Sequence, residues 1–149
     1  MNWDAIGAVA ELLSAIGVLA TLIYLSIQIR RNSSDVRNST LFAVMSRFAD
    51  NRRAHGTAVG ELTGRLEAGE ELTAEEKHKL RYFYQSSMQD FEAAYHQYLA
   101  GSISKEVMSA LDERLRMTMK TSTQDWNVQK RFFTKSFANH FDELINGGK

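Results

Sequence analysis

The chain has 149 residues, with 18 basic and 18 acidic side chains, so its formal net charge at pH 7 is zero. A neutral chain without a recognisable nucleic-acid-binding motif argues against a nucleic-acid partner. The sequence contains neither cysteine nor proline. The lack of cysteine excludes a disulfide scaffold and agrees with a reducing compartment.

Residues 6–29 form an apolar run that is interrupted by one charge, Glu11. As a helix this run spans about 36 Å, enough to cross a hydrocarbon layer of about 30 Å. Its twelve Leu, Ile and Val residues favour insertion by about 4–7 kcal/mol, whereas an acid costs on the order of 3 kcal/mol. Residues 1–31 are therefore predicted to be a transmembrane helix with a short outside N-terminus, rather than a buried core helix. A cleaved signal peptide is disfavoured because the first four residues lack a basic side chain.

The charges on either side of the apolar run predict the topology. Asp4 precedes the run, and Arg30, Arg31 and Arg37 follow it closely. By the positive-inside rule, the N-terminus lies outside and residues 32–149 form a cytoplasmic helical domain. The three arginines then lie at the membrane surface, either in contact with anionic lipid headgroups or on a solvated helix face.

The rest of the chain predicts helices only, because no stretch alternates between apolar and polar residues as a strand would. A break at residues 32–34 marks the domain boundary. An amphipathic helix with an apolar stripe at 36–48 follows and is expected to end near Gly56. A short, weaker segment with a glycine at every fourth position comes next and closes at Gly69.

The clearest helix start is the capping box Thr-Ala-Glu-Glu at residues 73–76. The helix it begins is expected to stop at Gly101. Ser104 is the expected N-cap of another helix, and the last helix is expected to begin after Ser122 and to end at the glycines 147–148. The fold class is therefore all-α: one transmembrane helix, then a small bundle of four to five cytoplasmic helices.

Motifs for catalysis are missing from the sequence. It has no nucleophile elbow, Walker loop, kinase signature or dinucleotide fingerprint. Glu75 and His78, like Glu92 and His96, have helical spacings that suit a metal, but neither pair has the further ligands that a site needs. We therefore expect that the protein is not an enzyme and that it has no catalytic residue, metal site or cofactor.

The chemistry is concentrated in the apolar helix, where a polar stripe and a small-residue stripe lie side by side. The polar stripe consists of Glu11, Ser14, Val18, Thr21, Leu25 and Gln28. The small-residue stripe consists of Gly7, Ala10, Ser14, Gly17 and Thr21. A single span cannot shield an acid from lipid, so we expect this helix to associate, preferably with copies of itself and otherwise with a heterologous membrane partner.

Two functions follow from such an assembly. In the first, the protein is a structural or accessory membrane subunit, and Glu11 and Ser14 form hydrogen bonds across a closed interface. In the alternative, the protein is a small homo-oligomeric cation channel lined by Glu11, Ser14, Thr21 and Gln28, with Val18 and Leu25 as apolar constrictions. The first is the expected function.

Residues near both ends of the chain also resemble those of known proteins. The resemblance rests on Trp-Asp-Ala-Ile-Gly-Ala at 3–8, Leu-Ala-Thr-Leu-Ile-Tyr-Leu-Ser-Ile-Gln-Ile-Arg-Arg-Asn at 19–32, and a late Trp126 followed by Phe133 and Phe137. In these residues the chain resembles a widespread, uncharacterised family of small single-pass bacterial inner-membrane proteins. The resemblance implies a bacterial inner-membrane location and a helical cytoplasmic domain. It implies no activity and no site residues.

Overall fold

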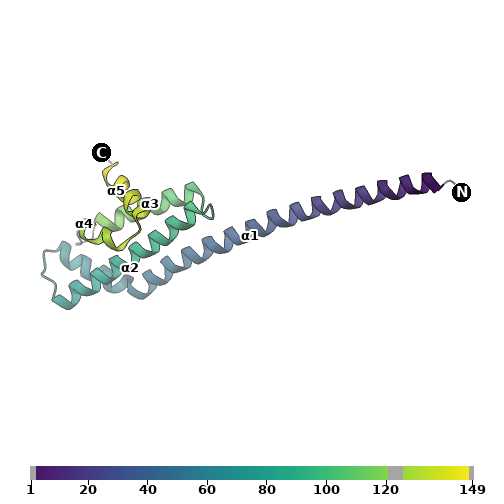
Figure 1. Ribbon diagram of the computed structural model, residues 1–149. Helices are drawn as coiled ribbons and strands as arrows, with labels where there is room; N and C mark the ends of the chain where they lie inside the picture. Colours follow the sequence, from purple (N-terminus) through teal and green to yellow (C-terminus); the bar gives the residue numbers. More distant parts are fainter. Residues whose placement is uncertain (1–2, 121–125, 148–149) are drawn as a thin grey trace. The chain divides into compact units, whose positions relative to one another are not determined.

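The computed structural model describes residues 3–120 and 126–147 (Figure 1). Within these ranges it contains helices and no strand, which confirms the all-α prediction. The elements are α1 (Trp3–Glu67), α2 (Ala74–Leu99), α3 (Lys105–Lys120), α4 (Trp126–Gln129), the 3₁₀ helix η1 (Lys130–Phe132) and α5 (Lys135–Asn146). The chain divides into a first unit, Met1–Asn38, and a second unit, Ser39–Lys149.

The first unit contributes the N-terminal part of α1. Every side chain from residue 6 to residue 38 is exposed in the single chain. The helical segment that begins at Ile6 is long and apolar enough to cross a membrane. In its most apolar stretch of 18 residues, no residue is buried. The segment is therefore a candidate membrane span on length and composition.

Two predicted helix ends in α1 are wrong. The helix continues through residues 32–34 and again past Gly56, ending at Glu67. At the first position, the Ser33 hydroxyl donates to the Ile29 carbonyl at 2.9 Å, so this polar side chain is satisfied within the helix. Low helix propensity is a weak signal, and neighbouring residues that favour a helix override it.

Packing explains why the glycine-containing end of α1 stays helical. Leu62 is buried in a small cluster that links the end of α1 to the start of α2. The other buried members are Leu72, Leu80 and Tyr84, and Val59, Leu66 and Phe83 pack against them. Gly69, with φ of 81°, follows the end of the helix.

The predicted start and stop signals of α2 and α3 are confirmed. Thr73 caps α2, and Glu76 completes the capping box. Gly101 follows the end of α2 with φ of 74°, a backbone conformation that favours glycine. The Ser104 hydroxyl accepts a hydrogen bond from the Val107 amide at 3.3 Å, as expected of an N-cap.

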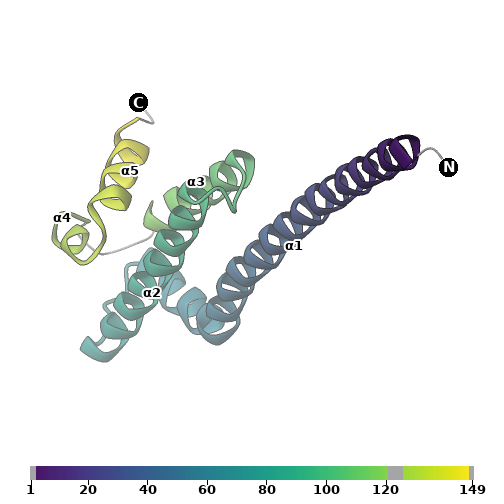
Figure 2. The ribbon, with the colours of Figure 1, turned by 45° about the vertical axis from the view of Figure 1, so that its right-hand side comes forward.

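The main core of the second unit lies between α2, α3, α5 and the part of α1 within this unit. Helices α2 and α3 lie side by side in two views (Figures 1 and 2). The buried core residues are Val44, Met88, Phe91, Ala94, Ile103, Met108, Leu111, Leu115, Trp126, Phe137, Ala138 and Phe141. Apart from Ala94 and Ala138, they are large apolar side chains.

The prediction of one continuous last helix is wrong, because α4, η1 and α5 take its place. The chain is extended at Phe133, with φ of −115° and ψ of 162°. Directly afterwards the Thr134 amide donates to the Glu92 carboxylate of α2 at 2.7 Å. This contact fixes the turn before α5. The predicted start after Ser122 and the final Gly148 lie outside the described residues.

Candidate functional site

The residues of the two predicted stripes all lie on α1 in the first unit, and their side chains are exposed. Because the segment is helical, each residue is rotated by about 100° from the one before it. The two stripes therefore overlap at Ser14 and Thr21 and occupy one side of the helix. The opposite side carries large aliphatic side chains, Leu12, Ile16, Leu19, Ile23 and Ile27.

The polar side chains of this stripe differ in whether they have a hydrogen-bond partner within the chain. The Thr21 hydroxyl donates to the Gly17 carbonyl within the helix at 2.9 Å. The Glu11 carboxylate has no hydrogen-bond or ion-pair partner among the residues that the structure describes. The acid is thus the group of this stripe that most requires a partner from outside the single chain.

Gly7 and Gly17 leave open space on the small-residue stripe. A Cβ atom at either position would meet no heavy atom within 4 Å. A glycine inside a helix is less favourable than alanine by about 0.5–1 kcal/mol, and packing within the chain does not require one here. Small residues at these positions leave room for the close approach of a second helix.

The predicted basic residues lie at the C-terminal side of the apolar segment. Arg30, Arg31 and Arg37 are all exposed on α1. None of the three forms an ion pair with a carboxylate in residues 3–120 or 126–147. Their charges are therefore available to an anionic surface or to water.

The histidine and acid pairs of the second unit form structural contacts. The Glu92 carboxylate accepts from the Thr134 hydroxyl at 2.8 Å, and His96 Nε2 lies 3.1 Å from the same hydroxyl. His140 Nε2 lies 2.8 Å from an Asp112 carboxylate oxygen. No group of three or more His, Asp or Glu side chains in the described ranges could hold a metal ion.

One half-buried acid in this unit, Asp90, has a raised pKa. Burial raises the pKa of Asp90, while the Asn51 side-chain amide, which donates to it at 3.3 Å, and the positive charge of Arg47 act in the opposite direction. The hydrogen bond and the positive charge therefore offset part of the effect of burial on the Asp90 pKa.

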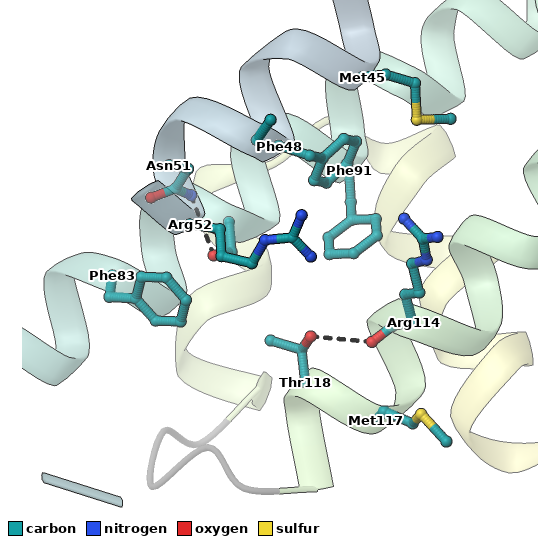
Figure 3. A pocket seen from close by; sticks show the side chains of 11 residues that line it. Met45, Phe48, Asn51, Arg52, Phe83, Phe91, Arg114, Met117 and Thr118 are labelled. Atoms are coloured by element: carbon teal, nitrogen blue, oxygen red, sulfur yellow. Dashed lines mark hydrogen bonds between the residues drawn. The ribbon is translucent and has the colours of Figure 1, made fainter. Parts of the chain in front are cut away.

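The sequence did not predict a pocket of about 480 Å³ in the second unit, between α1, α2 and α3 (Figure 3). It is lined by Met45, Phe48, Ala49, Asn51, Arg52, Phe83, Ser87, Phe91, Arg114, Met117 and Thr118. These residues come from three separate segments of the chain. The helix periodicity of each segment predicts a core face, but it does not show that the three faces leave a space between them.

Comparison with protein-family models, with curated proteins and with solved structures found no match for this chain. Two features of the described residues bear on function: the Glu11 carboxylate, which has no partner on the apolar helix, and the pocket in the second unit.

Proposed function

We propose that the protein is a non-enzymatic, single-pass integral membrane protein that assembles into a homo-oligomer through residues 6–29. In this role it is a structural or accessory membrane subunit. The observation that carries the proposal is the position of Glu11, an acid without a described partner on an otherwise apolar, exposed helix. An acid facing lipid costs on the order of 3 kcal/mol, and a hydrogen bond to Ser14 of a neighbouring copy offsets part of that cost.

The proposed orientation places the N-terminus outside and the second unit in the cytoplasm of a bacterial cell. Arg30, Arg31 and Arg37 support it, because basic residues favour the cytoplasmic side of a span. In this orientation they contact anionic headgroups of the inner leaflet. The resemblance at both ends of the chain supports the bacterial inner membrane as the location.

The mass of the protein in a mild detergent tests the assembly. One chain has a mass of 16.9 kDa. We expect the protein mass, after subtraction of bound detergent, to be a whole-number multiple of that value, two or greater. A single chain would contradict the proposal, and so would one copy bound to a different protein, since the proposed contact is between identical helices.

A cation channel is the second candidate function, because four polar residues of one stripe could line a path between associated helices. Glu11 would then form a ring of acids that attracts cations. Ion flux into liposomes separates the two functions. Assembly alone predicts no flux for either the native protein or Glu11→Gln, whereas a channel predicts native flux that falls at least several-fold in the variant.

A further inference from the structure

The pocket between α1, α2 and α3 has the size and the lining of a site for a small organic ligand. Its volume of about 480 Å³ lies within the range of roughly 300–1,000 Å³ that is typical of such sites. Five of its eleven lining residues are aromatic or carry a thioether: Met45, Phe48, Phe83, Phe91 and Met117. Such a wall accommodates an apolar body, and methionine adapts to its shape.

Most uncharged polar groups that line the pocket are engaged within the protein, whereas the buried Asn51 Oδ1 has no hydrogen-bond partner among the described residues. The Ser87 hydroxyl accepts from the Asn51 amide at 3.2 Å. The Thr118 hydroxyl donates to the Arg114 carbonyl at 2.9 Å. Asn51 Oδ1 can only accept hydrogen bonds, so the charged side chains of the pocket are the groups that can bind an anionic head.

Those charged side chains are two guanidinium groups, on Arg52 and Arg114. Neither forms an ion pair or a hydrogen bond through its side chain with any residue that the structure describes. By contrast, the neighbouring Arg53 is paired with Asp50 at 2.7 Å. Figure 3 shows Arg52 and Arg114 entering the pocket from opposite sides, with the Phe91 ring between them.

We propose that this pocket binds a single-chain amphiphile with an anionic head. The carboxylate or phosphate head pairs with the guanidinium groups of Arg52 and Arg114 beside the Phe91 ring, and the aliphatic chain lies against the phenylalanine and methionine side chains. Guanidinium groups stay charged at all relevant pH values and donate in pairs to carboxylate or phosphate oxygens. A neutral or cationic ligand of the same size leaves both charges without a counter-ion.

The full chain in lipid nanodiscs, labelled with a decanoic acid that carries a photoreactive diazirine, tests this site. We expect the label on peptides that contain residues 45–52, 83–91 or 114–118. Unlabelled decanoate or decyl phosphate should compete, and decanol should not. The stronger of the two anionic competitors identifies the head group. Competition by decanol at the same concentration would overturn the proposal, because the site would then select only for the apolar chain.

Variants separate the pocket from simple partition of the probe into the bilayer. The double variant Arg52→Gln, Arg114→Gln should reduce labelling of the pocket about tenfold or more, whereas Arg53→Gln should leave it unchanged. Ala49→Leu fills the pocket without changing its charge and should reduce labelling as well. Equal labelling of the native protein and the double variant, or label confined to residues 6–29, would overturn the proposal.

Discussion

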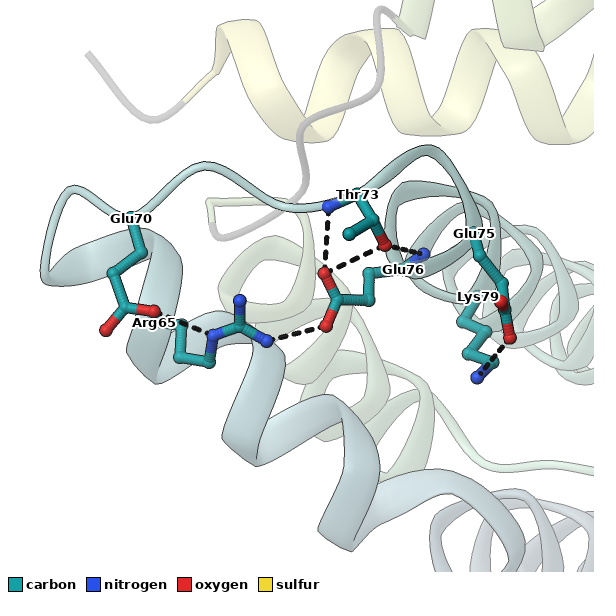
Figure 4. Close-up of polar contacts among 6 residues, drawn as sticks. All are labelled: Arg65, Glu70, Thr73, Glu75, Glu76 and Lys79. Carbon is teal, nitrogen blue, oxygen red and sulfur yellow. Dashed lines mark hydrogen bonds and ion pairs between the residues drawn. The ribbon is translucent and has the colours of Figure 1, made fainter.

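The carboxylate of Glu76 joins the end of α1 to the start of α2. One of its oxygens accepts from the Thr73 amide at 2.8 Å and from the Thr73 hydroxyl at 3.0 Å. The other accepts from the Arg65 guanidinium at 2.6 Å, and Arg65 also pairs with Glu70 (Figure 4). The Thr73 amide, followed by Arg65 and the Thr73 hydroxyl, lowers the pKa of Glu76 to about 2.

Replacing Glu76 with glutamine is predicted to destabilise the second unit. The amide has only one acceptor oxygen, so it cannot serve both Thr73 and Arg65 as the carboxylate does. We expect scanning calorimetry to show a Tm lower by about 3 °C or more. Glu75→Gln is the matched control, because Glu75 makes an exposed pair with Lys79 on the same helix. An equal loss in both variants would contradict the role of Glu76.

The low pKa of Glu76 also predicts how stability depends on pH. The group is ionised in the folded state down to about pH 2, against an ordinary value of 4.5. Its contribution is therefore present above about pH 4.5 and is lost as the pH falls toward 2. The difference in Tm between the native protein and Glu76→Gln should be constant from pH 7 to pH 5 and should shrink below that range. A constant difference down to pH 2 would contradict the assignment.

At the scale of the element, α1 contains glycines that make the helix less stable than alanine would. Gly60 and Gly64 lie within the helix, are exposed, and have no heavy atom within 4 Å of an added Cβ. Alanine at each position should stabilise the second unit by about 0.5–1 kcal/mol, because it loses less backbone entropy on folding. Calorimetry of Gly60→Ala and Gly64→Ala measures the gain directly.

Gly69→Ala is the contrasting control for these two variants. Open space also surrounds an added Cβ at this position, but φ is 81°. An L-residue is strained there, so this substitution should destabilise by about 1 kcal/mol. If all three substitutions had the same sign, backbone conformation would not be the deciding factor.

Local signals predicted the helix ends that depend on neighbouring residues. Thr73, Ser104 and Gly101 act within a few positions of themselves, so the sequence reveals them. The expected ends at residues 32–34 and at Gly56 rested on weak helix propensity alone. Packing of the segment around Leu62 decides the second case, and this packing depends on residues of α2.

The interruption before α5 shows the limit of local prediction more strongly. Phe133 and Phe137 are four positions apart and Trp126 lies seven positions before Phe133, so all three are spaced as on one helix. The contact that fixes the turn joins Thr134 to Glu92, 42 positions earlier. The periodicity of one segment cannot reveal a contact with a residue that lies so far away in the sequence.

At the scale of the whole molecule, the two units differ in how their apolar side chains are arranged. In the second unit the large apolar residues converge on a core, with Phe137 and Phe141 almost fully buried. In the first unit large apolar residues such as Leu12, Leu19 and Ile23 are about 60% exposed in the single chain (62%, 60% and 62%). The sequence predicted both stripes of the first unit from spacing alone, because one helix suffices to define them. The pocket needs three helices and could not be predicted in that way.

The proposed assembly predicts that the two sides of the first unit's helix respond differently to the same substitution. Ala10 lies on the small-residue stripe, and Ala8 lies about 160° away around the helix, within a turn of the same depth. Leucine at position 10 blocks close approach of a neighbouring helix, so Ala10→Leu should weaken self-association about tenfold, measured by sedimentation equilibrium in a mild detergent. Ala8→Leu adds the same volume on the lipid-facing side and should leave association unchanged. Equal weakening by both would place the interface elsewhere on the helix, because an interface along the stripe requires that only position 10 be sensitive.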